Sequence, residues 1–178
     1  MSRRAGGFVD SDDDPRATGP TVGGERAVLA EYLRAQRLTL EMKCQGLSAE
    51  ELARRSVEPS TMSLLGLVRH LADVERGWMR GTMSGLDAPP HWRLPDTDGD
   101  FDGAVADPDV VAHAWARWRE ECAFTDEVLA SMDLDATGDH HGQAVSLREV
   151  AVHLIEEYAR HNGHADLLRE RIDGRVGE

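Results

Sequence analysis

The chain has 178 residues, with 20 Lys and Arg against 33 Asp and Glu, so its formal net charge is −13. This length is enough for one domain with a sizeable hydrophobic core. So acidic a chain lacks the basic surface that binding to nucleic acid or to an anionic membrane requires. We therefore expect neither a nucleic-acid partner nor a membrane partner.

The chain contains no apolar run of the length, about 18 residues, that crosses a bilayer. Its first residues, Met1 to Gly7, lack the apolar stretch of a signal peptide. Two cysteines, Cys44 and Cys122, lie far apart in the sequence. They are typical of reduced core residues rather than of a disulfide framework, which favours a cytoplasmic protein.

Residues 1–23 are rich in Gly, Asp, Arg and Pro. Such a composition predicts a flexible N-terminal extension. The rest of the chain, residues 24–178, is then expected to form a single domain.

Helical patterns fill the first half of this domain. Residues 25–45 and 63–83 each carry apolar side chains at intervals of three and four, which predicts two long helices with buried faces. Between them, Ser48-Ala49-Glu50-Glu51 has the form of a capping box and predicts a short extra helix.

The second half predicts two further long helices. Gly85 to Ala106 is rich in turn-forming residues and is expected to be mostly loop. Asp107-Pro108 is typical of a helix start, and the third helix extends to about Met132. After a turn-rich connector over 133–145, a capping-box sequence at Ser146 begins the fourth helix, which ends before Gly174.

No segment has the alternation of a convincing β-strand. Four amphipathic helices of about twenty residues predict an all-α fold, an up-down four-helix bundle with a short extra helix. Trp115 and Trp118 offer a face for a homodimer but fit the interior pattern of the third helix better. Monomer and homodimer both stay open.

Three imidazoles and a carboxylate mark the fourth helix: His153, Glu157, His161 and His164. Residues three and four apart are neighbours on a helix, so all four side chains share one stripe. Successive rotations of about 100° place this stripe on the apolar face, away from the ordinary charges of the helix. The four side chains are therefore expected to point into the bundle.

A carboxylate buried among imidazoles needs a compensating charge, and a divalent cation supplies one. His70 lies among apolar residues of the second long helix, so the bundle can bring it opposite Glu157 and His161. Three protein ligands that leave open positions are the catalytic form of a metal site. The competing interpretations are a core histidine at His70 and a buried ion pair between Glu157 and His161. His153 and His164 are weaker ligand candidates, suited to orienting a ligand or lining a pocket.

Two segments, Leu64 to Trp78 and His153 to Glu170, resemble the DinB superfamily, and within it an actinobacterial branch of small mini-circle-type proteins. The resemblance covers roughly residues 24–174. It implies an up-down four-helix bundle with a divalent metal held by three residues. The histidine of the second long helix corresponds to His70. The usual H-x-x-x-H of the last helix is here Glu157 and His161, as in the E-x-x-x-H variant of mycothiol-dependent maleylpyruvate isomerase.

The resemblance also implies an activity, because characterised relatives include thiol-S-transferases that use mycothiol or bacillithiol. We expect a metal-dependent thiol-S-transferase that activates a mycothiol-like, low-molecular-weight thiol against a small electrophile. His70, Glu157 and His161 would hold the metal. His164 or His153 would act in catalysis by orienting a ligand or moving a proton.

Two alternatives remain open at the level of sequence. One is a metal-dependent hydrolase, for which Glu75 and Asp73 are available carboxylates, although both are expected first as surface residues. The other is a non-enzymatic protein that binds a metal or a small ligand. Zn²⁺ suits a ligand set of two histidines and one glutamate, and Ni²⁺, Fe²⁺ and Mn²⁺ also accept nitrogen and oxygen ligands.

A substrate pocket is expected where the 85–106 loop and the 133–145 connector meet the helices. His91, Trp92, His140 and His141 lie in these segments, and the paired loop histidines are expected to be solvated. Two arginines of the fourth helix, Arg160 and Arg169, are candidates for a carboxylate of the thiol. Their interpretation as solvent-exposed salt-bridge partners is stronger. Neither cysteine is placed as a nucleophile.

Overall fold

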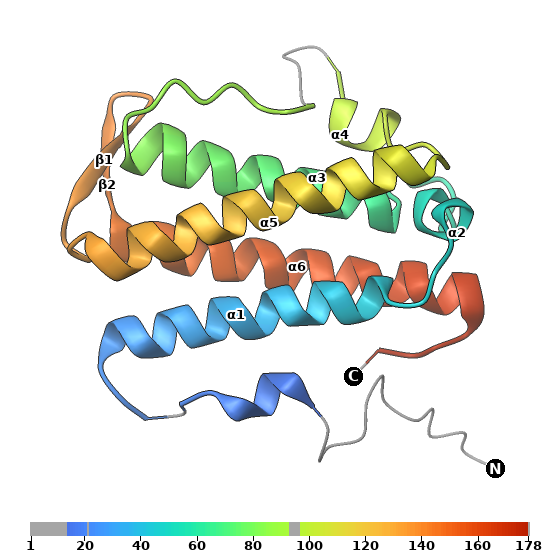
Figure 1. Cartoon of the computed structure of the whole chain (residues 1–178), viewed down its shortest axis with the longest axis horizontal. Coiled ribbons are helices and arrows are strands. Elements are labelled where there is room, and N and C mark those ends of the chain that lie inside the picture. The colour runs from blue at the N-terminus through green and yellow to red at the C-terminus, as the bar shows by residue number, and fades with distance from the viewer. Residues whose placement is uncertain (1–13, 21, 93–96, 178) are drawn as a thin grey trace.

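A computed structural model describes residues 14–20, 22–92 and 97–177 of the chain (Figure 1). Its α-helices are α1 (Glu25–Cys44), α2 (Ala49–Ala53), α3 (Leu64–Glu75), α4 (Gly99–Asp102), α5 (Pro108–Ser131) and α6 (Leu147–Asp173). A short 3₁₀ helix, η2 (Pro15–Thr18), precedes α1, and a π-helix, η3 (Arg76–Met83), continues α3 without a break. Two strands, β1 (Thr137–His140) and β2 (Gln143–Ser146), lie between α5 and α6.

The four long helices form a bundle in which α1 packs on α6 and α3 packs on α5 (Figure 1). The all-α four-helix bundle and the short extra helix α2 are thus confirmed. The directions of the helices differ from simple up-down alternation. Helices α3 and α5 run in one direction and α1 and α6 in the other, because the connector between η3 and α5 returns along the length of the bundle (Figure 1).

The predicted helix ends are set by local hydrogen bonds. The side chains of Ser48, Asp107 and Ser146 each accept a backbone N–H in the first turn of their helices. Ser48 and Glu51 form the complete reciprocal capping box. Gly174 ends α6 with a left-handed φ of 81°, a conformation that glycine adopts without strain.

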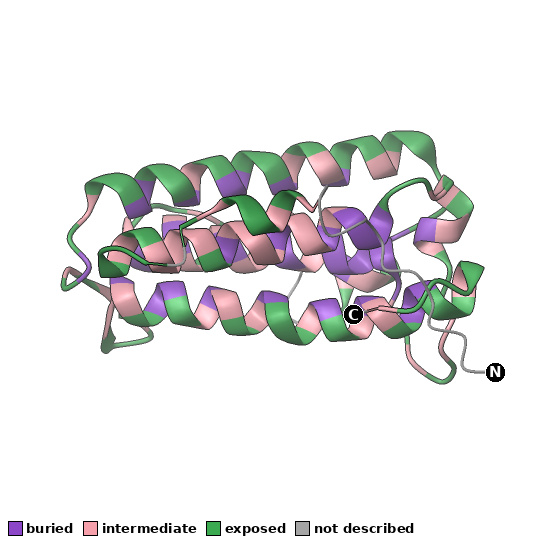
Figure 2. Cartoon of the chain, turned by 90° about the horizontal axis from the view of Figure 1, so that it is seen from below, coloured by how far each residue is buried: buried purple, intermediate pink, exposed green. Residues whose placement is uncertain are grey.

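The core lies along the inward faces of the four long helices (Figure 2). Helix α3 is buried almost all round, and its leucines are fully inaccessible to solvent. Cys44 and Cys122 are buried and unpaired with each other, as expected. Burial raises the pKa of the Cys44 thiol to about 12 and that of Cys122 further still. Trp118 is buried and Trp115 packs against it, so both contribute to the interior. Within the described residues, no helix is long and apolar enough to cross a membrane.

A β-hairpin replaces part of the connector in which no strand was expected. Strands β1 and β2 pair antiparallel, with His140 opposite Gln143, so the turn consists of His141 and Gly142. Both residues have positive φ, at 55° and 83°, as a tight two-residue hairpin turn requires. The sequence signal is weak because histidine stands where asparagine or aspartate is usual.

Part of the predicted N-terminal extension is ordered against the bundle. Residues 1–13 lie outside the described residues. In η2, the carbonyl oxygen of Pro15 and the hydroxyl of Thr18 accept hydrogen bonds from Arg34 of α1.

Two charged side chains expected at the surface are buried. Arg169 of α6 is 2% exposed and donates to the backbone carbonyl oxygens of Lys43 and Gln45, which fixes the end of α1 against α6. Glu75 is fully buried at the junction of α3 and η3. Arg169 does form a salt bridge, with Asp173 of its own helix at 2.7 Å, but its exposure was misjudged because Lys43 and Gln45 are distant in sequence. Glu75 was misjudged because its cation, Arg37, lies on another helix.

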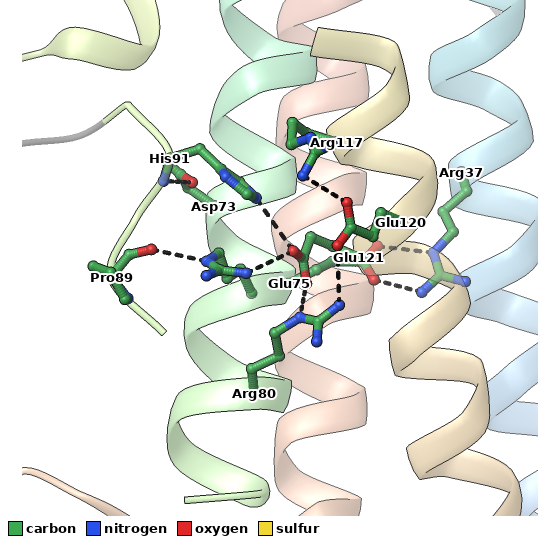
Figure 3. Close-up of polar contacts among 10 residues, drawn as sticks. Arg37, Asp73, Glu75, Arg80, Pro89, His91, Arg117, Glu120 and Glu121 are labelled. Carbon is green, nitrogen blue, oxygen red and sulfur yellow. Dashed lines mark hydrogen bonds and ion pairs between the residues drawn. The ribbon is translucent and has the colours of Figure 1, made fainter. Parts of the chain in front are cut away.

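Glu75 is paired with Arg37 of α1, itself only 7% exposed (Figure 3). Two guanidinium nitrogens of Arg37 donate to the two carboxylate oxygens of Glu75 at 2.8 and 2.6 Å. The hydroxyl of Tyr158 in α6 donates to Glu75 at 2.5 Å and accepts from the indole of Trp118 in α5 at 2.7 Å. One buried carboxylate therefore links all four long helices.

Replacing Arg37 with alanine should lower the free energy of unfolding by about 3 to 5 kcal/mol, because Glu75 would be left as a buried charge without its cation. The matched control is Arg34→Ala, three residues earlier in α1. Its ion pair with Glu31 is partly exposed to solvent and its hydrogen bonds to Pro15 and Thr18 are exposed, so the loss should stay below about 1 kcal/mol. Urea unfolding followed by circular dichroism measures both. If both variants lost the same free energy of unfolding, the Arg37–Glu75 pair would contribute no more to stability than an exposed ion pair.

Candidate metal and substrate site

The structure brings together the three side chains predicted as metal ligands. His70 projects from α3, and Glu157 and His161 project from α6. One potential ligand atom from each residue lies within 4.8 Å of the other two. The Nε2 atoms of His70 and His161 lie 3.9 and 3.5 Å from Oε2 of Glu157. The three atoms thus face a common point between two helices.

Asp100 of α4 is a site residue that the sequence analysis missed. It is 2% exposed, and its Oδ2 lies 2.8 Å from Nδ1 of His70. A carboxylate at this nitrogen favours the tautomer that carries its proton on Nδ1, so the lone pair of Nε2 points toward Glu157 and His161. Asp100 was missed in the sequence analysis because Asp98-Gly99-Asp100 is typical of a turn and gives no sign of a contact with His70.

Helix α4 reaches His70 because Gly66 leaves room for Phe101. A Cβ at Gly66 would lie 2.5 Å from the Phe101 ring, so only glycine allows this approach. Phe101 also stacks on His70, with ring centroids 5.7 Å apart. Arg69 donates to the carbonyl oxygen of Gly99 at 2.8 Å and fixes the start of α4. These contacts position Asp100.

The other two histidines of the stripe contact the ligand candidates from either side. Nε2 of His153 lies 3.5 Å from Oε1 of Glu157, the oxygen that does not face His70. Nδ1 of His164 lies 3.3 Å from Nδ1 of His161. Among the described residues, every ion-pair partner of Glu157 is a histidine.

The electrostatics of the site keep His161 uncharged. Burial, together with the neighbouring imidazoles of His70 and His164, lowers the pKa of its imidazole to about 4. A neutral imidazole has a free lone pair, which is the form that binds a metal.

A cleft of about 570 Å³ begins at His70 and extends along η3. Val74, Gly77, Trp78 and Gly81 form its helical side, while Pro90 and the hairpin residues Asp139 to His141 form the opposite side. The cleft is therefore lined by both the 85–106 loop and the 133–145 connector, as expected. His140 is half-buried and stacks on Trp78 at 4.3 Å, which corrects its interpretation as a solvated loop residue. Trp92 lies over Arg69 instead of lining the cleft.

The hairpin reaches the cleft through a close backbone contact. A Cβ at Gly138 would lie 2.2 Å from the carbonyl oxygen of Thr82, so glycine is required where β1 crosses η3. The π-helical conformation of η3 widens the helix at this point, a feature often found at functional sites.

The connector that carries Pro90 is held by charged side chains (Figure 3). Asp73 accepts the backbone N–H groups of His91 and Trp92 at 2.6 and 3.1 Å. Arg76 donates to the carbonyl oxygen of Pro89, and the His91 ring lies 3.2 Å from Glu121. Asp73 is therefore committed to fixing this wall of the cleft.

The model of a protein family described as mycothiol-S-transferase matches residues 28–174. Among solved structures, one described as the conserved protein of a locus from Enterococcus faecalis superposes with a TM-score of 0.62. That chain is 17% identical, and the alignment covers 86% of this chain and 99% of the other. At this identity the likeness supports the fold alone. No curated protein gives a significant match.

The imidazole of His161 should stay neutral from pH 7 down to about pH 5, because its pKa is lowered to about 4. A pH titration of the histidine ring signals by NMR, in metal-free protein, measures this directly. The variant His161→Gln assigns the signal by its disappearance. A His161 signal that titrates above about pH 6, the range of an ordinary histidine, would contradict the described burial.

Proposed function

Since the chain belongs to the mycothiol S-transferase family, we propose that it is a metal-dependent enzyme that transfers a mycothiol-like thiol to a small electrophile. Family membership accords with the sequence resemblance to the DinB superfamily, which is thereby confirmed. The observation that carries the metal dependence is the convergence of Glu157 and His161 on His70, which also lines the cleft.

The donor set suits a divalent cation. Two imidazole nitrogens and one carboxylate oxygen are ligands that Zn²⁺ accepts, and three protein ligands leave positions free for a substrate. Glu157 lies among histidines without an arginine or lysine partner in the described part of the chain. A cation at this point would balance its charge. When bound, the cation supplies a Lewis acid that lowers the pKa of a thiol, so that thiolate forms at neutral pH.

The chain's own residues would orient the site and move the proton. Asp100 holds His70 with Nε2 toward the site. Nδ1 of His164 would do the same for His161 when it accepts the proton on Nδ1 of His161. His153 lies beside Glu157 and packs against the ring of Trp78, which lines the cleft. We assign it the role of accepting the thiol proton and passing it to solvent. The sulfur then forms its bond to the electrophilic carbon as the leaving group departs with its electron pair.

The structure weakens the hydrolase alternative in one respect. The two carboxylates considered for it have other partners, because Glu75 is buried against Arg37 and Asp73 binds the backbone of the connector. A purely metal-binding or ligand-binding role predicts stoichiometric binding without a product.

Purified protein loaded with Zn²⁺ should form a conjugate from mycothiol and a neutral electrophile, followed by mass spectrometry. His70→Ala, Glu157→Gln and His161→Ala should each weaken Zn²⁺ binding by more than about a hundredfold, since even an outer partner is worth 10- to 100-fold. His113→Ala, which replaces an exposed histidine of α5, is the control. Turnover without added thiol would indicate hydrolysis, and bound metal without any product would contradict the transferase.

Asp100→Asn tests the positioning of His70 separately. The amide can still accept from Nδ1 but loses the negative charge, so Zn²⁺ affinity should fall by roughly 10- to 100-fold while the fold is retained. Competition with a chromophoric chelator measures the affinity, and thermal unfolding checks the fold. Asp102→Asn, an exposed carboxylate at the end of the same short helix, is the matched control. If both variants bind Zn²⁺ as the wild type does, Asp100 has no role at the metal.

A further inference from the structure

One side of the cleft is formed by helix backbone instead of side chains. Gly77 and Gly81 lie four residues apart in η3 and both line the cleft. A Cβ added to either would have no atom within 4 Å, so each glycine faces open space. Together they leave a flat strip of backbone on which a planar group can lie.

An aromatic pair borders this strip. The rings of Trp78 and His140 stack with centroids 4.3 Å apart and planes 19° apart. His153 packs against the same indole at 4.7 Å. The indole is therefore held in place from both the hairpin and α6, and it offers a rigid aromatic edge to a ligand on the strip.

The polar groups that line the cleft are largely engaged within the protein. Asp73 accepts two backbone N–H groups, and Oδ1 of Asp139 accepts the N–H of Gly142 at 3.1 Å. The Thr82 hydroxyl lies 3.5 Å from Nδ1 of His140. A ligand rich in hydroxyl groups would find few free partners here, whereas a flat ring needs only surface contact.

We propose that this cleft binds the electrophile as a flat aromatic ring over Gly77 and Gly81. The inference rests on the proposed function, since it names the second substrate class of that reaction. With chlorodinitrobenzene as a probe, the thiol sulfur bonds to the ring carbon that carries chlorine. The carbon–chlorine bond breaks, chloride leaves with the electron pair, and the thiol proton passes to solvent.

Equilibrium binding of unreactive probes tests the cleft without any turnover. Equilibrium dialysis of the full chain against dinitrobenzene should give saturable binding. Gly81→Leu and, independently, Gly77→Leu should weaken it by at least about tenfold, because the added side chain fills the strip. Gly24→Leu, at another glycine that faces open space but does not line the cleft, should leave binding unchanged. Unchanged binding in both cleft variants, with their fold verified by circular dichroism, would overturn the assignment.

Kinetics then separate this inference from the proposed function. In a chain that conjugates mycothiol, Gly81→Leu should raise KM for chlorodinitrobenzene and leave KM for the thiol unchanged. A rise in KM for the thiol alone would mean that the cleft holds the thiol, and the inference would be wrong. If no conjugate forms at all, the transferase fails, while the dialysis result still decides whether aromatic rings bind over the glycines.

Discussion

The buried ion pair between Arg37 and Glu75 is the constraint on which the other features depend. Both charged groups are buried, so the pair is favourable only in a well-defined geometry. Glu75 also binds Tyr158, the residue next to Glu157 in α6. The rotation of α6 that buries the Tyr158 hydroxyl on Glu75 also turns the neighbouring carboxylate toward His70, five residues before Glu75 in α3. The polar core and the metal-site geometry are thus two outcomes of one helix packing.

The candidate site combines two kinds of support. The long helices provide His70, Glu157 and His161 from a rigid scaffold, which suits ligand atoms that must keep fixed distances. The connector and the hairpin provide the walls, through Pro90 and Asp139 to His141. Asp100 joins the two, since it belongs to the connector but acts on His70. Ion pairs of Glu121 with Arg76 and Arg80 hold η3 to α5 beside this wall (Figure 3).

Local signals made most of the helices predictable. Capping residues and apolar periodicity depend on neighbours within a few positions. The helix ends at Ser48, Asp107, Ser146 and Gly174 could therefore be predicted from the sequence. Periodicity also places His70, Glu157 and His161 on inward faces, and the structure brings them together. The burial of Glu75 and the role of Asp100 depend on contacts across 38 and 30 residues, which no local pattern encodes. The hairpin was not predicted because His141 occupies a left-handed turn position at which other residue types are usual.

The crossing connector between η3 and α5 has a consequence for how such a protein can change. In a strictly alternating bundle, the second and third helices would be joined by a short turn. Here α3 and α5 run parallel, so the chain needs a long return segment, and that segment forms one wall of the cleft. Substitutions near Pro90 would reshape what the cleft admits without moving a ligand atom on α3 or α6, provided that Asp100, later in the same segment, keeps its contact with His70. The topology thereby separates substrate choice from chemistry, and one bundle can acquire new substrates by altering its least regular part.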